Sequence, residues 1–165
     1  MAEPLRTVAI LVANPALSSI LSMTLAGSPS LRVRPFDTQV ALTTYLHLVP
    51  ADLLVVDFDS VPARADLLAD ALHHDGKIAS RHLQIIALAS ALTPDAKASS
   101  IRAGIDEIIM KPMSPRYLLE RVMARLAKAA PPPPPARLPR RNDWTSFGSN
   151  VVPMIRRAPQ PERVV

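Results

Sequence analysis

The chain has 165 residues, of which 48% are apolar, 20% are charged and 4% are aromatic, and it contains 18 prolines, four glycines and no cysteine. This length accommodates one domain of about 100–150 residues and an additional segment. The lack of cysteine excludes a disulfide scaffold, a cysteine nucleophile and thiolate metal sites. The composition is compatible with a reducing compartment, and we expect a cytoplasmic protein.

The net charge of +5 comes from the C-terminal part of the chain. Residues 1–127 hold twelve basic and twelve acidic side chains, whereas residues 128–165 hold seven basic and two acidic ones. Half of the prolines also lie in residues 128–165, including the run 131–135, which favours a stiff polyproline II spacer. We therefore predict a neutral domain over 6–127 and a disordered, Pro-rich basic tail over 128–165. The charge excess does not indicate that the domain binds nucleic acid.

Neither a membrane span nor a signal peptide is expected. No apolar stretch reaches the roughly 18–20 residues that a spanning helix needs. Near the N-terminus the apolar run covers only residues 8–13 and no basic segment precedes it, which is untypical of a signal peptide.

Short apolar runs alternate with segments of helical periodicity between residues 6 and 127. The apolar runs predict strands at residues 8–12, 31–34, 53–56, 83–88 and 107–110. The first, third and fourth are almost continuously apolar, as is typical of parallel strands covered on both faces, and alternating arginines make the second an edge strand. Five strand–helix units in succession predict an α/β fold with a doubly wound parallel sheet.

A helix is predicted after each strand. Asn14, Thr93 and Ser114 each precede a proline at the first helical position, and Asp37 is the predicted cap of the second helix. The third helix is expected to begin at about Arg64. Helical spacing places one set of side chains on the core-facing side of each of four helices. The sets are Leu17, Ile20, Leu21, Thr24 and Leu25 in the first helix, and Val40, Ala41, Tyr45 and Leu46 in the second. They are Leu67, Leu68, Ala71 and Leu72 in the third helix, and Leu118, Leu119, Val122, Met123 and Leu126 in the fifth.

Polar side chains follow several of the predicted strands, and ligands bind at this carboxyl edge in open α/β sheets. Asn14 follows the first strand, Asp57 and Asp59 the third, Ser90 the fourth and Lys111 the fifth. Asp57 and Lys111 are the two charges that we expect to meet, because each lies at the end of an apolar strand. A carboxylate and an ammonium group in this arrangement can accept and hold a phosphoryl group.

Two segments resemble the receiver domain of bacterial response regulators. Residues 101–122 are similar to the end of that domain, with an Ala-Gly pair, the dipeptide Lys111–Pro112 and a helix that starts with Ser-Pro. Residues 50–57 resemble the strand that carries the family's phosphoacceptor aspartate. The resemblance covers residues 6–127 and implies a flavodoxin-like fold with five strands in the order 2-1-3-4-5.

The resemblance also implies a role in two-component signal transduction, a phosphorelay. Asp57 would accept a phosphoryl group from a histidine kinase or phosphotransfer protein, and Lys111 and Ser90 would bind that group. The peptide bond before Pro112 is a candidate for the cis form, which is frequent in the family at this position.

The sequence departs from the family's pattern at the metal site and at two switch positions. The family holds Mg²⁺ with an acidic pair after the first strand, and Val12-Ala13-Asn14 contains no carboxylate. Asp57 and Asp59 are the remaining candidate ligands, so only weak Mg²⁺ binding is expected. The family's switch serine or threonine aligns with Ala89, one residue before the serine named above, and its aromatic switch residue aligns with Ile108.

Two functions remain open from the sequence. One is an atypical stand-alone receiver that is phosphorylated on Asp57 and docks a downstream protein, or a second copy, through its fourth helix, fifth strand and fifth helix. The other is a phosphorylation-independent pseudo-receiver, an adaptor whose tail docks on a partner through Trp144 and Phe147. An enzyme is not expected, because the sequence has no Gly-rich phosphate loop, no Gly-x-Ser-x-Gly elbow and no base–nucleophile pair.

Overall fold

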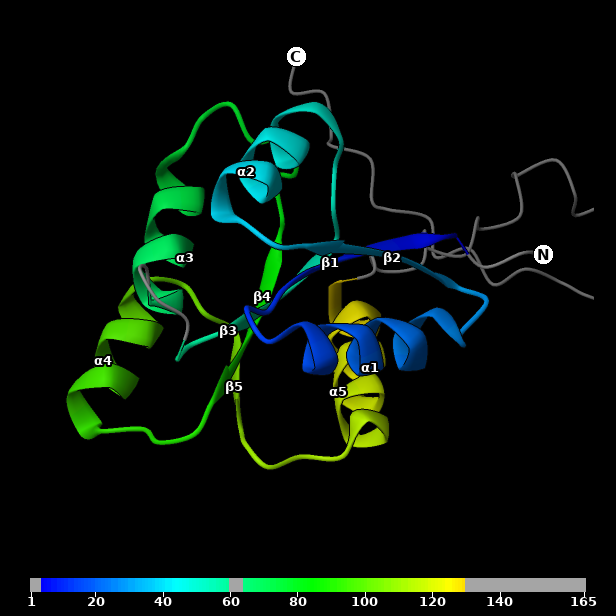
Figure 1. Cartoon of the computed structure of the whole chain (residues 1–165). Coiled ribbons are helices and arrows are strands. Elements are labelled where there is room, and N and C mark those ends of the chain that lie inside the picture. Colours follow the sequence, from blue (N-terminus) through cyan, green and yellow to red (C-terminus); the bar gives the residue numbers. More distant parts are fainter. Residues whose placement is uncertain (1–3, 60–63, 130–165) are drawn as a thin grey trace, which may run out of the picture. The chain divides into compact units, whose positions relative to one another are not determined.

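Strands and helices alternate through residues 4–59 and 64–129, which are the residues that the computed structural model describes (Figure 1). The predicted tail, with Trp144 and Phe147, lies outside them, except that Lys128 and Ala129 belong to the last helix. The elements are β1 Arg6–Leu11, α1 Pro15–Ala26, β2 Leu31–Phe36, α2 Gln39–Leu48, β3 Leu53–Asp57, α3 Ala65–His74, β4 Gln84–Ala89, α4 Pro94–Arg102, β5 Glu107–Met110 and α5 Pro115–Ala129.

All five strands are parallel and form one sheet in the order β2-β1-β3-β4-β5, which confirms the predicted flavodoxin-like topology. The central strand β3 is buried at every residue. By contrast, β2 lies at an edge, and Leu31 is its only buried residue. The strand tolerates Pro35 because an edge strand can lack a ladder donor. The carboxyl ends of β3, β4 and β5 therefore lie next to one another.

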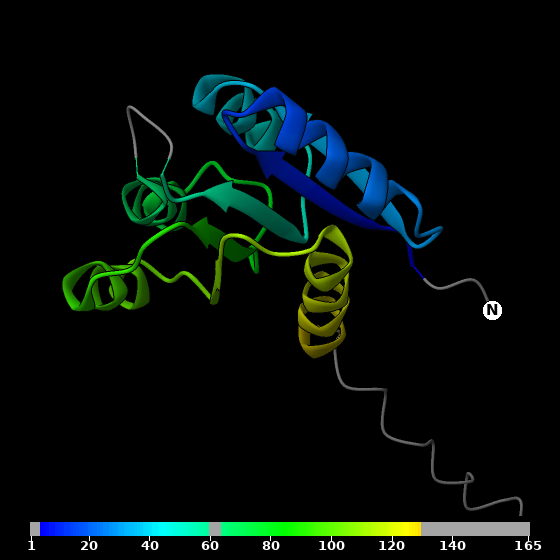
Figure 2. The ribbon, with the colours of Figure 1, turned by 60° about the horizontal axis from the view of Figure 1, so that its bottom comes forward.

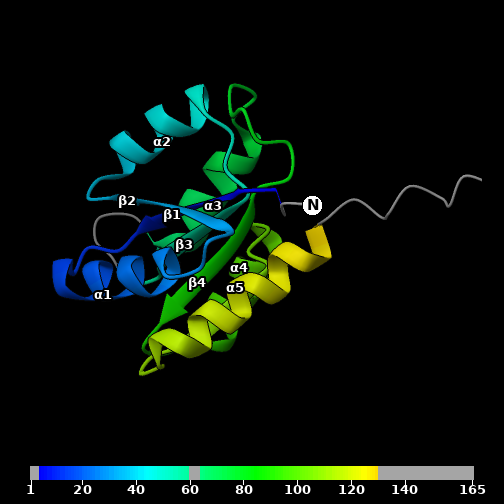
Figure 3. The ribbon, with the colours of Figure 1, turned by 90° about the vertical axis from the view of Figure 1, so that its right-hand side faces the viewer.

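Alternate strand residues point to opposite faces of the sheet and create two apolar layers. Helices α1 and α5 cover one face, and Figure 3 shows them on the same side of the strands. Helices α2 and α3 cover the other face. The layer beneath α1 and α5 contains Val8, Ile10, Val55, Ile86, Leu88, Leu21, Leu25, Leu118 and Val122; the opposite layer contains Ala9, Leu54, Val56, Ile85, Ala87, Leu42, Leu46, Leu68 and Leu72.

Helix α4 contributes little to either apolar layer. Within it only Ser100 is buried, and the Ser100 hydroxyl donates a hydrogen bond to the Ala96 carbonyl at 2.7 Å. Figures 1 and 2 show α4 next to α3 at one edge of the domain. The position of α4 therefore depends on its contacts with α3 and on its connecting loops more than on apolar packing against the sheet.

The helix starts follow the predicted capping residues with one exception. Asn14 Oδ1 accepts from the backbone N–H groups of the first turn of α1, and Thr93 and Ser114 cap α4 and α5 in the same way. The cap of α2 is Thr38, not Asp37. Thr38 has extended backbone angles and its hydroxyl accepts from Ala41 N at 3.2 Å, because the helix begins one residue later than predicted.

Several side chains that were predicted to face the core are exposed. Ile20, Val40 and Leu67 are 45%, 76% and 58% exposed, respectively. The other exposed members of the predicted sets are Ala41, Ala71 and Met123. In α1 and α2 apolar residues are not confined to one side of the helix, so helical spacing alone allows more than one core-facing stripe. In α2 the buried pair is Leu42 and Leu46.

Gly104, which follows α4, has a backbone conformation and a close neighbour that exclude a larger residue. Its φ is +82°, and a Cβ atom there would lie 2.8 Å from Cε1 of His73. His73 is held in place, because its Nδ1 donates to the carbonyls of Ala69 and Ala103 at 2.8 and 3.0 Å. We predict that Gly104→Ala lowers the free energy of unfolding by about 1–2 kcal/mol or more, measured by urea denaturation with circular dichroism.

Gly76→Ala is the matched control, since a Cβ at Gly76 meets nothing within 4 Å. An equal loss of stability in both variants would contradict the assignment of the effect to the backbone and to His73.

Candidate functional site

The candidate site lies where β3, β4 and β5 end. Asp57 is the last residue of β3 and is 7% exposed. The next residue remains paired with the sheet, because Phe58 N donates to the Leu88 carbonyl at 2.7 Å. Lys111 follows β5, and its backbone N donates to the carbonyl of Ala89, the last residue of β4, at 2.7 Å. The strands themselves thus position both charged residues.

Lys111 reaches across the end of β4 and bridges two carboxylates. Its Nζ lies 2.9 Å from Oδ1 of Asp57 and 2.9 Å from Oδ2 of Asp59. The structure therefore brings together the two residues that the sequence predicted to meet and adds Asp59 as a second anion. One ammonium group faces two carboxylates, so the three side chains carry a net charge of −1 when all are ionised.

Backbone groups hold Asp59 in this arrangement. Asp59 N donates to Oδ1 of Asp57 at 3.0 Å, and Ser90 N donates to Oδ2 of Asp59 at 2.8 Å. Burial disfavours the charged form of Asp59, but the hydrogen bonds from Lys111 and Ser90 outweigh it and lower its pKa. Burial also opposes the charge of Lys111, and its hydrogen bonds to both carboxylates raise its pKa nevertheless.

The other predicted site residues lie as follows. Ser90 is at the same edge, where its backbone N–H binds Asp59. The peptide bond between Lys111 and Pro112 is cis. Trp144 and Phe147 fall outside the described residues.

With Lys111 bound to both carboxylates, the oxygen donors at this edge do not fit a Mg²⁺ site. Mg²⁺ requires several oxygen ligands in near-octahedral geometry. Val12 is buried and apolar, and the Asn14 side-chain oxygen already accepts from the N–H groups of Ala16 and Leu17 as a helix cap. Oxygens of Asp57 and Asp59 are bound to Lys111. In the described part of the chain, no cluster of three or more acidic or histidine side chains is suited to a metal ion.

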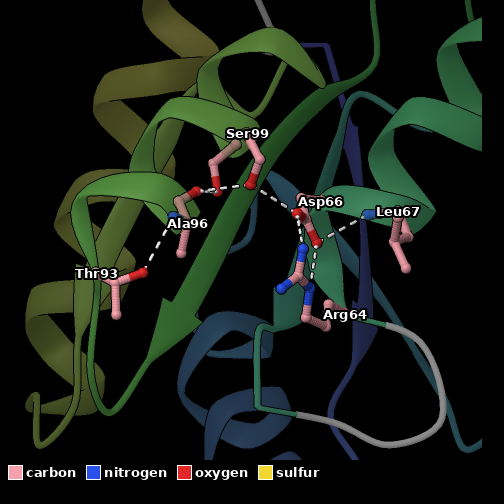
Figure 4. Close-up of polar contacts among 7 residues, drawn as sticks. Arg64, Asp66, Leu67, Thr93, Ala96 and Ser99 are labelled. Atoms are coloured by element: carbon pink, nitrogen blue, oxygen red, sulfur yellow. Dashed lines mark hydrogen bonds and ion pairs between the residues drawn. The ribbon is translucent and has the colours of Figure 1, made fainter.

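A second polar cluster connects α3 to α4 and was missed by the sequence analysis (Figure 4). Asp66 is 3% exposed and accepts hydrogen bonds from Arg64 Nε, from Arg64 Nη2, from Leu67 N and from the Ser99 hydroxyl at 2.7–3.1 Å. The Arg64 guanidinium also lies over the Phe58 ring, 5.9 Å from its centroid. The available signal was an acidic residue in the first turn of α3, directly before two leucines.

Five parallel strands in the order 2-1-3-4-5, with an aspartate at the end of β3 and a lysine after β5, form the arrangement that the resemblance to receiver domains implies. Comparison with solved structures agrees. The chain is similar to a CheY-like response regulator receiver domain protein from Methanospirillum hungatei, with 21% identity, a TM-score of 0.66 and coverage of 75% of this chain and 95% of that one. The chain therefore has the receiver-domain fold.

Two further structures show the same similarity. For the receiver domain of a Francisella response regulator, the identity is 14%, the TM-score 0.65 and the coverage 75% of this chain and 98% of that one. For a response regulator from Thermotoga maritima, the identity is 20%, the TM-score is 0.64, and the match covers 74% of this chain and 98% of that one. No family model matches the chain, and no curated protein matches its sequence. None of the helices among residues 4–59 and 64–129 has the length and apolar character needed to cross a membrane.

The buried carboxylate of Asp66 predicts a pH dependence of stability. Burial opposes its charge, but the hydrogen bonds from Ser99 and Arg64 lower its pKa below the ordinary value. Its contribution to stability is therefore complete above the unfolded-state pKa of about 4 and is lost as the pH falls from there through the folded-state pKa. We predict that the free energy of unfolding falls less between about pH 5 and pH 3 in Asp66→Asn than in the wild type.

The measurement is the free energy of unfolding in urea across this pH range. Asp70→Asn is the matched control, because Asp70 lies one turn later on the same helix with an exposed side chain. Parallel pH profiles for wild type and Asp66→Asn would show that Asp66 does not titrate in this way.

Proposed function

We propose that this chain acts in two-component signal transduction as a pseudo-receiver. In this role it docks partner proteins through the receiver fold without transfer of a phosphoryl group to Asp57. It is a binding protein and not an enzyme, and it works in the cytoplasm. Its partners are a histidine kinase or phosphotransfer protein and a downstream protein.

The observation that carries this proposal is the bridge from Lys111 to Asp57 and Asp59. Phosphoryl transfer depends on cations that neutralise the charge developing on the transferred group, and Mg²⁺ supplies much of that charge in phosphotransfer proteins. Here the described residues form no cluster of three or more acidic or histidine side chains that could hold Mg²⁺, and the ammonium group of Lys111 is already shared by the two carboxylates at the edge. This electrostatic arrangement disfavours the approach of a dianionic phosphoryl group.

The surface of α4, β5 and α5 supports partner docking. Each of these elements exposes a large apolar side chain: Ile101 is 66% exposed, Met110 45% and Tyr117 47%. The acidic group on β5 is neutralised within the domain, since Glu107 forms ion pairs with Arg121 and Arg125 of α5. The hydrogen bond from Arg121, together with that from Arg125, keeps the pKa of Glu107 below its ordinary value in spite of burial. An apolar partner surface would therefore meet little uncompensated acidic charge here.

A phosphorylated switch is the second candidate function, and one observation, on the second oxygen of the Asp57 carboxylate, supports it. Oδ1 of Asp57 binds Lys111 and the backbone of Asp59, whereas Oδ2 accepts no hydrogen bond from the described residues. An oxygen of this kind is the nucleophile that a phosphoacceptor requires, and the Lys111 ammonium lies within reach of a group attached there.

Incubation with acetyl phosphate and millimolar Mg²⁺, followed by intact mass measurement, separates the two candidates. We predict no phosphorylated species for the wild-type chain, because the edge lacks a Mg²⁺ site and its ammonium is engaged. Asp57→Asn is the control for modification elsewhere. An increase of one phosphoryl group that Asp57→Asn abolishes would establish the switch and contradict phosphorylation-independent action.

Charge introduced into the apolar surface tests the docking step. We predict that Ile101→Glu weakens cross-linking to a purified partner kinase or downstream protein at least tenfold, because it places a carboxylate in an apolar contact. Leu48→Glu on α2 is the matched control, since Leu48 is 77% exposed and lies on a helix outside the proposed docking surface. Equal cross-linking of both variants and the wild type would exclude this surface.

A further inference from the structure

The carboxyl edge of the sheet already contains a bound cation, the ammonium group of Lys111. Its Nζ is 2.9 Å from an oxygen of Asp57 and 2.9 Å from an oxygen of Asp59. These two carboxylates are the ones from which a divalent cation at this edge would have to be bound. The ammonium and such an ion therefore compete for the charge of the same two carboxylates.

The competition is unequal because Lys111 is part of the chain. Its backbone is fixed by the hydrogen bond to Ala89 at 2.7 Å, and its side chain is only 19% exposed. A tethered group has a high effective concentration at its binding site. Displacement by a free ion would also leave a partly buried ammonium without its anions, which is costly.

The carboxylates are arranged for the ammonium as well. Asp59 receives the N–H of Ser90 on the oxygen that binds Lys111, and Asp57 receives the N–H of Asp59 on its own Lys111-binding oxygen. These contacts hold the Asp59 carboxylate against the Lys111 ammonium. Asp59 is thus a positioning residue for Lys111.

We propose that Lys111 is the permanent cation of this edge and prevents divalent cations from binding to Asp57 and Asp59. Removal of the ammonium leaves two adjacent carboxylates without a counterion, and they then take up a divalent cation. This inference goes beyond the docking proposal, because it concerns what the edge binds and not what the surface recognises.

The test uses the full chain and two variants, Lys111→Met and Lys111→Gln. Lys111→Met removes the charge at similar length, and Lys111→Gln keeps a hydrogen-bond donor in case the first variant folds poorly. Mn²⁺ binding is measured from the loss of the free-ion signal in electron paramagnetic resonance. Thermal unfolding is measured with millimolar MgCl₂ against NaCl of equal ionic strength.

The expected result is no Mn²⁺ binding and no Mg²⁺-specific shift in Tm for the wild type. The variants should bind one Mn²⁺ per chain, and their Tm should rise by about 5 °C at roughly ten times the dissociation constant for Mg²⁺. The double variant Lys111→Gln/Asp59→Asn should lose this response. The proposal is overturned if the wild type binds Mn²⁺ as tightly as the variants do, or if neither variant binds it.

The result is independent of the phosphorylation assay. If the wild-type chain failed to react with acetyl phosphate but bound Mn²⁺ at Asp57, the docking proposal would stand. The proposal that Lys111 excludes divalent cations would be contradicted.

Discussion

The shared ion pair of Lys111 is the interaction on which the carboxyl edge of this domain depends. Asp57 ends a strand that is buried at every residue, and an unpaired carboxylate there would be expensive to keep charged. The sheet order places β5 two strands away from β3, so only a long cationic side chain after β5 can reach it. The same contact that stabilises Asp57 also occupies the group that would receive an incoming anion. The stabilisation of Asp57 and the binding of any further anion therefore make opposing demands on one ammonium group.

The strands and the main contact of the site could be predicted from the sequence because both follow from strand position. Parallel strands covered by helices are read as apolar runs, and the residues after them share one edge, so Asp57 and Lys111 were expected to meet. Asp59 could not be assigned in this way. It lies three residues beyond the predicted strand, where no periodicity determines side-chain direction, and its position depends on the N–H of Ser90, which follows another strand.

The helix faces were less predictable than the strands for a physical reason. Helix α1 contains no charged residue, and α2 none apart from a histidine, so solvent and core faces differ little in polarity. Only one narrow stripe of each helix packs against the sheet, although several stripes are apolar. Ile20 and Val40 lie outside that stripe and are exposed to solvent. Likewise Asp37 and Thr38 are both good capping residues, and the extended backbone at Thr38 decides between them.

Helix α4 shows how this chain positions an element that has almost no apolar anchor. Its only buried residue is Ser100, and a neighbouring serine, Ser99, binds the buried carboxylate of Asp66 on α3. Further along, His73 of α3 donates to the Ala103 carbonyl directly after α4. Apolar packing tolerates small sliding movements, whereas hydrogen bonds to a buried charge lose much of their energy when the angle or distance changes. The orientation of α4, and of Ile101 exposed on it, is therefore set from α3 by directional polar contacts.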